Sequence, residues 1–408
     1  MASRTTFSDP AWSRGLSVLL CAVLLGPWVG AQQSGARGSG STSGDRFFGA
    51  AANRAIGFSS RYLESACDQT GRFAYLVDPN SGRQSPSYNV IRHAGAMYGL
   101  ALLNRAHPDR KTVDAMMRAG AYLRANYVGA DARSGALVVW SRPRGMASQA
   151  SLGAAGLGLA ALAEVDRAET NAIPVTELEG LGKFVVFLQS SDGSFASRYR
   201  ADAGPDEEWE SLYYPGEAAL GLVTLYEVDH KRGWLDAAGR ALGWLARRRG
   251  HGEEVPLDHW ALIAMARLLP SCGGSDCSMS RAQLIGYAGH VSDALLRGQL
   301  ENGSFDEAGR TAPTATRMEG LLAALEFLPD DATGRRARIQ AAVDRGIAFL
   351  LRAQITNGPY AGGMPQAVPE ANSVVVQRDP RASDIRIDYV QHALCAWLRY
   401  ETMFGGRR

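Results

Sequence analysis

Carboxylate and imidazole side chains recur near the starts of alternate helical segments of this sequence, where they could act as acids and bases. Glu217 and Glu319 are the two carboxylates whose positions favour such a role, and His93 could carry a proton. Two carboxyl groups about 5–5.5 Å apart would suit retaining cleavage of a glycosidic bond, and about 6.5–9.5 Å would suit inverting cleavage. We therefore predict Glu217, Glu319 and His93 as the catalytic candidates.

The segment around His93 has the residue types that uronate chemistry needs. Asn89, Arg92 and His93 are spaced by three and four positions, so they share one helical face, and Tyr88 precedes them. An asparagine or arginine can neutralise a sugar carboxylate while a histidine or tyrosine moves the proton on the neighbouring carbon. Tyr88, Asn89 and Arg92 are therefore predicted to bind substrate. The alternative for Arg92 is an ion pair with an acid in the protein wall.

Six further polar residues near helix starts are also predicted to bind substrate: Gln149, Tyr214, His259, Arg317, Asp388 and His392. Structural roles compete with several of these assignments. Glu217 could stabilise the positive end of a helix dipole, and Glu319 could pair with Arg317 inside the wall. His259 and His392 could be wall histidines that are satisfied by neighbouring hydrogen bonds.

The charged residues of the chain are nearly balanced. The 43 lysines and arginines almost balance the 41 aspartates and glutamates, for a formal charge of +2, which indicates neither nucleic acid nor a membrane surface. No Cys-x-x-Cys pair, His-Glu-x-x-His sequence, phosphate loop or EF-hand loop occurs. We therefore expect no metal ion and no cofactor. The expected partner is a glycan or another polar or anionic ligand, and the oligomeric state stays open.

Helical spacing of apolar residues predicts an all-α chain. Small residues such as Gly153, Gly156 and Gly158 concentrate in the even-numbered helices and would let them approach closely, whereas odd-numbered helices have more charge. Long odd-to-even connections would gather on one rim, where function often lies. We predict an (α/α)6 toroid of six helical hairpins, with inner and outer rings, from helices at residues 47–66, 88–105, 110–126, 148–164, 177–190, 213–228, 233–249, 257–269, 280–299, 314–327, 335–354 and 384–402.

A repeated pattern supports this architecture. Glutamine, three residues, glycine, one residue and an aromatic follow one another from Gln189, Gln299 and Gln354, whose positions differ by 110 and 55 residues. The pattern resembles the repeat of squalene-hopene cyclases and their relatives, most closely over residues 345–360, with tyrosine in place of the usual tryptophan. The resemblance implies an α/α toroid, which also houses glycosidases, polysaccharide lyases, sugar epimerases, lanthionine cyclases and binding domains. The Asp-x-Asp-Asp acid sequence of those cyclases is absent.

The N-terminal residues predict export. Residues 1–31 are expected to be a signal peptide, because Arg4 and Arg14 flank the apolar run Leu16–Val29 and small residues follow it. An uncleaved anchor is the main alternative, and a lipoprotein attached through Cys21 is a weaker one, because Leu19 and Leu20 precede that cysteine in place of small residues. The Ser- and Gly-rich residues 32–45 are predicted to be a flexible linker, and residues 46–408 to be the toroid domain. The protein would then act in the periplasm or outside the cell, with no membrane attachment after cleavage.

Export would permit disulfide bonds among the cysteines that follow the signal. Cys272 and Cys277 flank a short loop with two glycines and are expected to pair. Cys67 and Cys395 lie in the first and last predicted helices, which a closed ring would make neighbours. They would either form a disulfide across that seam or remain two buried thiols.

The leading hypothesis is an exported carbohydrate-active protein that acts on an acidic or polyhydroxylated glycan. Polar residues at the starts of converging inner helices would form a bowl, and its reaction would be of the hydrolase, lyase or epimerase type. One alternative is a non-catalytic toroid that binds a glycan, peptide or protein, which predicts no acid pair at reaction distance. The other is a terpenoid cyclase-like protein without the usual acid sequence, which predicts a deep apolar cavity.

Overall fold

The computed structural model describes residues 43–142, 149–206, 208–250, 255–272, 280–330, 333–368 and 379–405. Residues Thr42–Arg408 make one unit, and its described part contains twelve α-helices. All predicted helices are confirmed, with ends within four residues of those observed. They are α1 (Ser43–Ala66), α2 (Val90–Ala106), α3 (Arg110–Tyr127), α4 (Leu152–Ala168), α5 (Val175–Phe187), α6 (Tyr214–Asp229), α7 (Arg232–Arg249), α8 (His259–Leu268), α9 (Arg281–Leu296), α10 (Thr311–Leu325), α11 (Arg335–Ala353) and α12 (Ile387–Tyr400).

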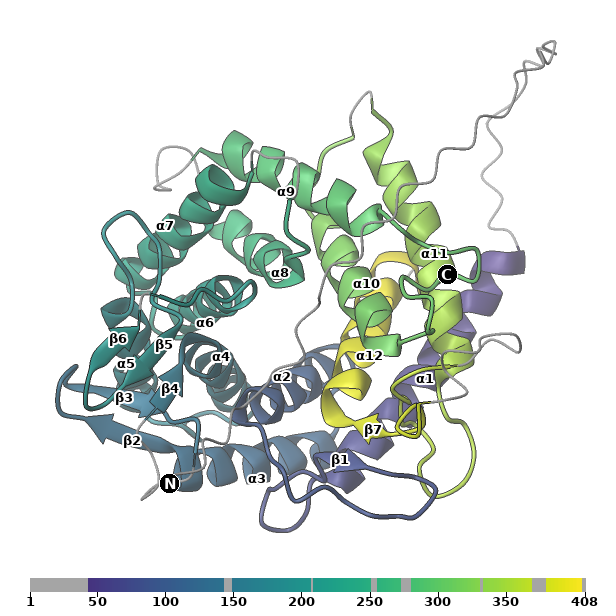
Figure 1. Cartoon of the computed structure of the whole chain (residues 1–408), viewed down its shortest axis with the longest axis horizontal. Coiled ribbons are helices and arrows are strands. Elements are labelled where there is room, and N and C mark those ends of the chain that lie inside the picture. The colour runs from purple at the N-terminus through teal and green to yellow at the C-terminus, as the bar shows by residue number, and fades with distance from the viewer. Residues whose placement is uncertain are drawn as a thin grey trace, which may run out of the picture. The chain divides into compact units, whose positions relative to one another are not determined.

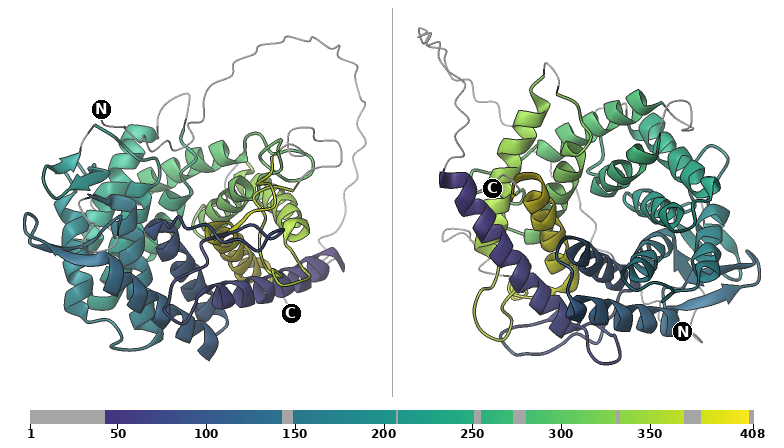
Figure 2. Two further views of the ribbon diagram at one scale, coloured as in Figure 1. Left: turned by 60° about the horizontal axis from the view of Figure 1, so that its bottom comes forward. Right: turned by 180° about the vertical axis from the view of Figure 1, so that it is seen from behind.

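The even-numbered helices form a closed inner ring within this unit. Helices α2, α4, α6, α8, α10 and α12 pack against one another in that order, and α12 returns to pack against α2 (Figure 1). The odd-numbered helices surround them, and α1 packs against both α11 and α12 where the ring closes (Figure 2). The chain therefore has the predicted (α/α)6 toroid fold. None of the described helices is long and apolar enough to cross a bilayer.

Glycines set the spacing between several inner helices. A Cβ atom added to Gly156 of α4 would lie 2.5 Å from the carbonyl oxygen of Glu217 on α6. One added to Gly216 of α6 would lie 2.6 Å from the backbone nitrogen of Ala261 on α8. Real Cβ atoms do not approach so closely, so any side chain at these positions would push the helices apart. The concentration of small residues predicted for the inner ring has this physical reason.

The three glutamines of the repeated pattern each tie one outer helix to the next outer helix. The Nε2 atom of Gln189, after α5, donates to the carbonyl oxygen of Ala237 on α7 at 2.9 Å. The equivalent bonds run from Gln299, after α9, to Ala342 on α11 at 2.8 Å, and from Gln354, after α11, to Ala55 on α1 at 3.0 Å. The Gln354 bond joins residues that are 299 positions apart. It therefore closes the outer ring.

The glycine of the pattern lets the following loop lie against the same helix. Gly193 has a φ of +97°, and a Cβ atom there would lie 2.2 Å from the carbonyl oxygen of Arg240 on α7. Both the backbone conformation and the contact therefore require glycine. Equivalent contacts, at 2.0–2.1 Å, occur at three other glycines: Gly71, Gly303 and Gly362.

Two of these contacts differ from the sequence interpretation. In the copy that begins at Gln354, Gly362 approaches the next helix, whereas a Cβ atom on Gly358 would meet nothing within 4 Å. A fourth copy begins at Cys67 instead of glutamine, and its thiol lies 3.6 Å from the carbonyl oxygen of Ala115 on α3. Cysteine can make this contact because its sulfur is a weak hydrogen-bond donor.

The same structure settles one question about the cysteines. Cys67 and Cys395 are buried free thiols, so no disulfide joins α1 to α12. Cys67 is directed at α3, while Cys395 lies beside Gly99 of α2 and Gln391 of its own helix. Cys277 lies outside the described residues, and its pairing with Cys272 stays a prediction.

The long connections follow the odd-numbered helices and contain short antiparallel strands. Strand β1 (Leu76–Val77) pairs with β7 (Ile385–Arg386), and β2 (Val128–Asp131) pairs with β3 (Ala136–Val139) so that Val128 lies opposite Val139. Strands β4 (Gln149–Ser151), β5 (Arg198–Arg200) and β6 (Gly204–Asp206) form a third sheet in that order. A 3-10 turn (Leu269–Ser271) and a π-helix (Glu401–Gly405) follow α8 and α12. The long connections with their strands lie at the rim where the inner helices start, whereas the 3-10 turn and the π-helix lie at the ends of inner helices.

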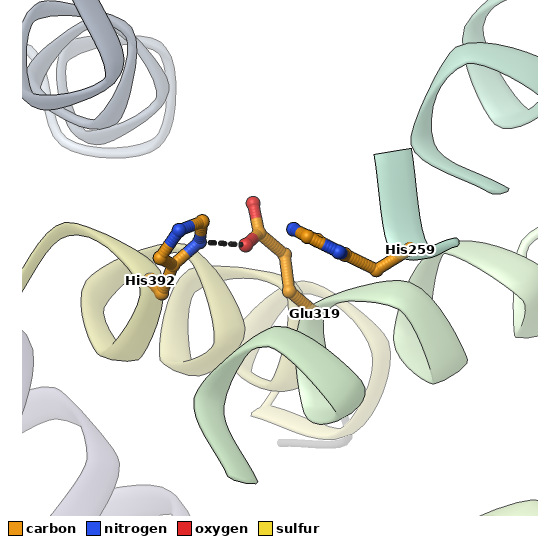
Figure 3. Close-up of side chains that lie close together, drawn as sticks. All are labelled: His259, Glu319 and His392. Atoms are coloured by element: carbon orange, nitrogen blue, oxygen red, sulfur yellow. Dashed lines mark hydrogen bonds and ion pairs between the residues drawn. The ribbon is translucent and has the colours of Figure 1, made fainter. Parts of the chain in front are cut away.

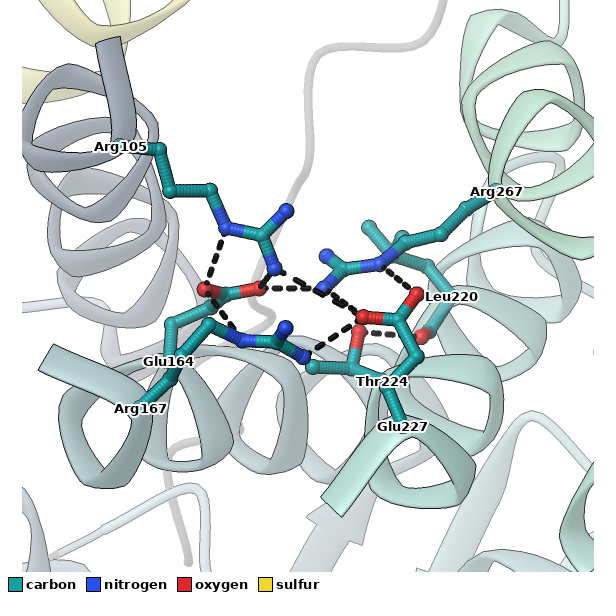
Figure 4. Close-up of polar contacts among 7 residues, drawn as sticks. All are labelled: Arg105, Glu164, Arg167, Leu220, Thr224, Glu227 and Arg267. Carbon is teal, nitrogen blue, oxygen red and sulfur yellow. Dashed lines mark hydrogen bonds and ion pairs between the residues drawn. The ribbon is translucent and has the colours of Figure 1, made fainter. Parts of the chain in front are cut away.

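A network of ion pairs joins four inner helices at their C-terminal ends (Figure 4). Arg267 of α8 donates to Glu164 of α4 and to Glu227 of α6, in both cases at 2.6 Å. Arg105 of α2 binds Glu164 at 2.7 Å, and Arg167 of α4 binds Glu227 at 2.6 Å. Glu164 is 2% exposed, and its buried charge is balanced by more than one arginine. The network fixes the inner ring at the end opposite to the long loops.

The glycine contacts of the outer ring lead to a first prediction. Gly193→Ala should destabilise the fold by about 3 kcal/mol or more, because the methyl group would overlap the Arg240 carbonyl and the backbone would be strained. Gly358→Ala is the matched control, since its φ is +77° but its methyl group would meet open space. It should lose only about 1–2 kcal/mol. Chemical denaturation of both variants measures the difference, and equal losses would refute a steric role for Gly193.

Candidate functional site

Three polar side chains from three inner helices meet inside the ring. His259 is the first residue of α8, Glu319 lies within α10, and His392 lies in the second turn of α12. One ligand atom from each lies within 4.8 Å of the others. Figure 3 shows the two imidazole rings on opposite sides of the Glu319 carboxylate. We call these three residues the His–Glu–His cluster.

Local features of the sequence bring the cluster together. Asp258 caps the start of α8, because its Oδ1 atom accepts a hydrogen bond from the backbone nitrogen of Ala261 at 3.1 Å. This cap fixes His259 at the first helical position. Gly320 then allows α10 to lie directly against α8, since a Cβ atom there would be 2.8 Å from the Cβ of His259. Glu319, the residue before this glycine, is thereby held beside His259.

Two polar atoms of the cluster are buried without a hydrogen-bond partner. The Nδ1 atom of His392 lies 2.8 Å from Oε2 of Glu319, which forms an imidazole–carboxylate pair. The other carboxylate oxygen, Oε1, has no partner among the described residues, and neither has Nε2 of His259. Glu319 is 0% exposed and His259 is 3% exposed. An unpaired buried polar atom costs about 1–3 kcal/mol, so this arrangement can gain from a bound group.

Aromatic rings enclose the imidazole of His259. The ring of Trp260 lies 5.1 Å from that of His259 and 5.9 Å from that of His392, and Tyr213 contacts His259 edge-on at 5.2 Å. Burial, together with the neighbouring His392, lowers the pKa of His259 well below its ordinary value. His259 is therefore a neutral imidazole at physiological pH, able to accept a proton or to donate an electron pair.

Two arginines share one carboxylate next to the cluster. Asp388, four residues before His392 in α12, accepts two bonds from Arg386 at 2.6 and 2.8 Å and pairs with Nε of Arg92 at 3.1 Å. Burial disfavours its charged form, but the two guanidinium groups outweigh that effect and hold the pKa of Asp388 below its ordinary value. Arg92, Arg386 and Asp388 together therefore carry one net positive charge. The Arg92 side chain is 32% exposed and that of Arg386 is 22% exposed, so solvent or a ligand can reach the excess charge.

Glu217 lies in a different part of the ring wall from Glu319. Its Oε2 atom has no hydrogen-bond partner within the part of the chain that the structure describes, and it lies 2.4 Å from where a Cβ on Gly153 of α4 would be, so the carboxyl group fills the space between α6 and α4. Burial, and secondarily the charge of Asp258, raises the pKa of Glu217 to about 8. The sequence pairs Glu217 with Glu319 as acid and base, whereas the structure places Glu319 between two histidines instead.

The predicted residues at the start of α2 divide into two groups. His93 is 1% exposed and points away from the ring centre, because its Nε2 atom contacts the carbonyl oxygen of Ala119 on α3 at 3.0 Å. Its Nδ1 atom lies 2.7 Å from the hydroxyl of Tyr88, which accepts a bond from the backbone of Phe73. Asn89 is the N-cap of α2. Of these four candidates, only Arg92 is near the cluster, through Asp388.

The remaining substrate-binding candidates are more scattered. Gln149 is exposed in strand β4, ahead of α4, since that helix begins only at Leu152. Arg317 donates to the carbonyl oxygens of Leu295 and Arg297 at the C-terminal end of α9 and covers the ring of Phe305. Tyr214 is half-buried against Trp209. The sequence pattern does not indicate that Gln149 lies in a strand or that Arg317 binds the end of a neighbouring helix.

Several neighbours of the cluster were not among the predicted site residues: Asp258, Trp260, Tyr213 and Arg386. The run Asp258-His259-Trp260 contains a helix cap, an imidazole and a large aromatic in succession, and this could have drawn attention to all three. Nothing in the sequence marks Arg386 as the partner of Asp388 except its spacing of two residues at the edge of a short strand.

Comparisons with known proteins agree with this architecture. The chain has the (α/α)6 toroid fold found in six-hairpin glycosidases and sugar epimerases. In particular, it resembles cellobiose 2-epimerase from Bacillus thermoamylovorans, with a TM-score of 0.63 and 14% identity over 87% of this chain and 99% of that one. A D-mannose isomerase gives a TM-score of 0.62 and 12% identity over 86% and 98% of the two chains.

Glycoside hydrolases are also among the similar structures. An α-1,6-mannanase from a Salegentibacter species has a TM-score of 0.57 and 12% identity over 88% of this chain and 99% of that chain. An inactive variant of that mannanase is in complex with α-1,6-mannotriose. No protein-family model matches the sequence, and no curated protein matches it. At these identities, the likeness establishes the fold.

The buried carboxyl of Glu217 predicts a pH-dependent stability. Because its folded pKa of about 8 lies above its ordinary value of 4.5, the folded state keeps a proton that the unfolded chain releases between these pH values. Stability should therefore fall as pH rises through this window, by up to about 1.4 kcal/mol per pH unit from this group. Glu217→Gln, which stays neutral, should lose less stability from pH 5 to pH 8.

Denaturation curves at several pH values measure this effect. Glu169→Gln is a suitable control, because the Glu169 side chain is 45% exposed. Parallel stability profiles for the wild type and Glu217→Gln would contradict the prediction.

Proposed function

We propose that this protein is a carbohydrate-active enzyme that transfers a proton at the carbon next to the carbonyl group of a reducing sugar, as an epimerase or isomerase does. The observation that supports the proposal is the His–Glu–His cluster, which places two imidazoles and a carboxylate together within the inner ring. The similarity of the fold to cellobiose 2-epimerase and D-mannose isomerase points in the same direction. This reaction needs no oxidant, since the proton removed from the carbon is later returned.

His392 is the imidazole best placed to contact the sugar. Its side chain is 12% exposed, whereas Glu319 is fully buried behind it. The 2.8 Å contact with Glu319 fixes the orientation of the ring, as in other imidazole–carboxylate pairs, and leaves its second nitrogen for the substrate. That nitrogen would remove the proton from the carbon adjacent to the carbonyl and leave an enediolate.

His259 supplies a second proton carrier in the same cluster. Return of a proton to the opposite side of the same carbon gives the epimer, and return to the neighbouring carbon gives the ketose. An epimerase needs one group to remove the proton and another to deliver it. The Nε2 atom of His259 has no partner among the described residues, so it would first take up a proton, and the resulting imidazolium would then deliver that proton to the carbon.

The neighbouring arginines favour an oxygen-rich sugar. Arg92 and Arg386 leave one positive charge beyond Asp388, and both are partly exposed. Guanidinium groups donate hydrogen bonds to negatively charged oxygens, so they would stabilise the negative charge that develops on the enediolate oxygen. An acidic or polyhydroxylated substrate, as the sequence suggests, would gain from the same charge.

Hydrolysis fits this geometry less well. Glycosidases use two carboxyl groups that face each other across the bond to be cleaved. Here Glu319 is engaged with His392 near α12, while Glu217 is enclosed between α6 and α4. A terpenoid cyclase is disfavoured for another reason, because charged and imidazole groups line the candidate site. We also propose that the enzyme is exported, on the basis of the predicted signal in residues 1–31.

Exchange of the sugar's carbon-bound hydrogen for deuterium from the solvent tests the proposed reaction directly. The protein is incubated in D2O with aldoses, reducing disaccharides and uronic acids, and NMR follows deuterium at the second carbon and the appearance of epimer or ketose. The variant His392→Asn should lower the exchange rate by about 100-fold or more, because general acid–base groups contribute about that much. Reducing-end and ultraviolet assays run in parallel detect hydrolysis and lyase products.

A matched control is available at the other end of α2. His107 and Glu401 also form an imidazole–carboxylate pair, at 2.6 Å, but the His107 side chain is 48% exposed and belongs to the opposite rim. His107→Asn should leave exchange unchanged. Exchange that survives in His392→Asn, or cleavage without exchange across the sugar panel, would refute the proposed function.

A further inference from the structure

The His–Glu–His cluster also has the composition of a metal site, which the sequence analysis did not expect. Two imidazole nitrogens and one carboxylate oxygen, from α8, α10 and α12, lie within 4.8 Å of one another. Ligand atoms about 2.1 Å from a tetrahedral ion lie about 3.4 Å from one another, so side-chain movements of up to about 1.4 Å would close the three groups around a metal. The residues are more than 50 positions apart in the sequence, and only the closed ring assembles them.

A second observation points to a ligand at the same place. Oε1 of Glu319 and Nε2 of His259 are buried and have no hydrogen-bond partner among the described residues. Figure 3 shows the ring of His259 directed toward the Glu319 carboxylate, with no side chain of the cluster between them. Two electron-pair donors facing each other cannot satisfy one another unless a proton or a cation lies between them. A divalent ion satisfies both at once and also neutralises the buried carboxylate.

We propose that Glu319, His259 and His392 bind one divalent transition-metal ion, with zinc as the best match. Imidazole and carboxylate ligands suit zinc and its first-row neighbours, whereas magnesium and calcium prefer oxygen ligands alone. Three protein ligands leave a fourth position open, as in metal sites that also take water or a substrate oxygen. Trp260 and Tyr213 contact the imidazoles and limit access of bulk water to the ion.

This site does not depend on the proposed function, because metal binding is measured without sugar. An ion held there would take up the electron pairs that the proposed proton transfer uses. The zinc-bound protein would then be the form inactive in that reaction. A failure of either idea can therefore be distinguished from a failure of the other.

The test uses the full-length protein freed of metal by a chelator. Titration with Zn2+ should show one equivalent bound, and Co2+ should give the visible absorption of a four- or five-coordinate site with nitrogen ligands. Magnesium should not compete. His259→Ala and Glu319→Gln should each weaken binding by more than about 100-fold, which exceeds the 10–100-fold that loss of an indirect partner costs. His107→Ala, in the exposed His107–Glu401 pair, should bind zinc like the wild type.

A measurement on the wild type guards against variants that fail to fold. With 15N-labelled histidine, zinc should shift the imidazole signals of two of the seven histidines and leave the others unchanged. Assignment of those two signals to His259 and His392 supports the site. Shifts confined to other histidines, zinc binding that is equal in the folded Glu319→Gln variant, or no binding at stoichiometric zinc would overturn the proposal.

Discussion

The contact between a loop and the next outer helix is the constraint on which the ring depends. In each of four copies, a side chain at the end of an outer helix binds a carbonyl oxygen one neighbour away, and a glycine lets the loop backbone touch that same helix. The two contacts fix both the distance and the rotation between outer helices. The inner helices, tied to the outer ones by short turns, then have little freedom in where they point.

Different interactions hold the inner helices together at the two ends of the ring. At the C-terminal ends, arginines and glutamates from four helices hold the ring through buried ion pairs, such as Arg267 with Glu164. At the N-terminal ends, close backbone contacts through Gly216, Gly320 and others bring polar side chains together. The candidate site is therefore a by-product of tight helix packing on one rim. Its unpaired atoms can be tolerated because the opposite rim and the outer ring secure the fold.

The sequence was sufficient for the fold and for part of the site. Helix boundaries, the two rings and the role of small residues could be predicted, because apolar periodicity and a fixed repeat determine them. His259, Glu319 and His392 were each named, but not as one group, since three helices far apart in the chain contribute them. The direction of His93 could not be deduced, because α2 is buried on both its inner and outer sides and its hydrophobic pattern marks neither face. For the same reason, Glu217 gave no sign that it would face α4.

The bond from Gln354 to Ala55 has a consequence for how the molecule is made. A ribosome releases α1 first, yet the helix that completes its surroundings emerges only after nearly 300 further residues. Until then the partly synthesised ring is an arc with two open ends. Joining these ends costs chain entropy, and the whole cost falls on one late folding step. Newly synthesised copies must stay separate throughout this interval, because the open end of one arc matches that of another.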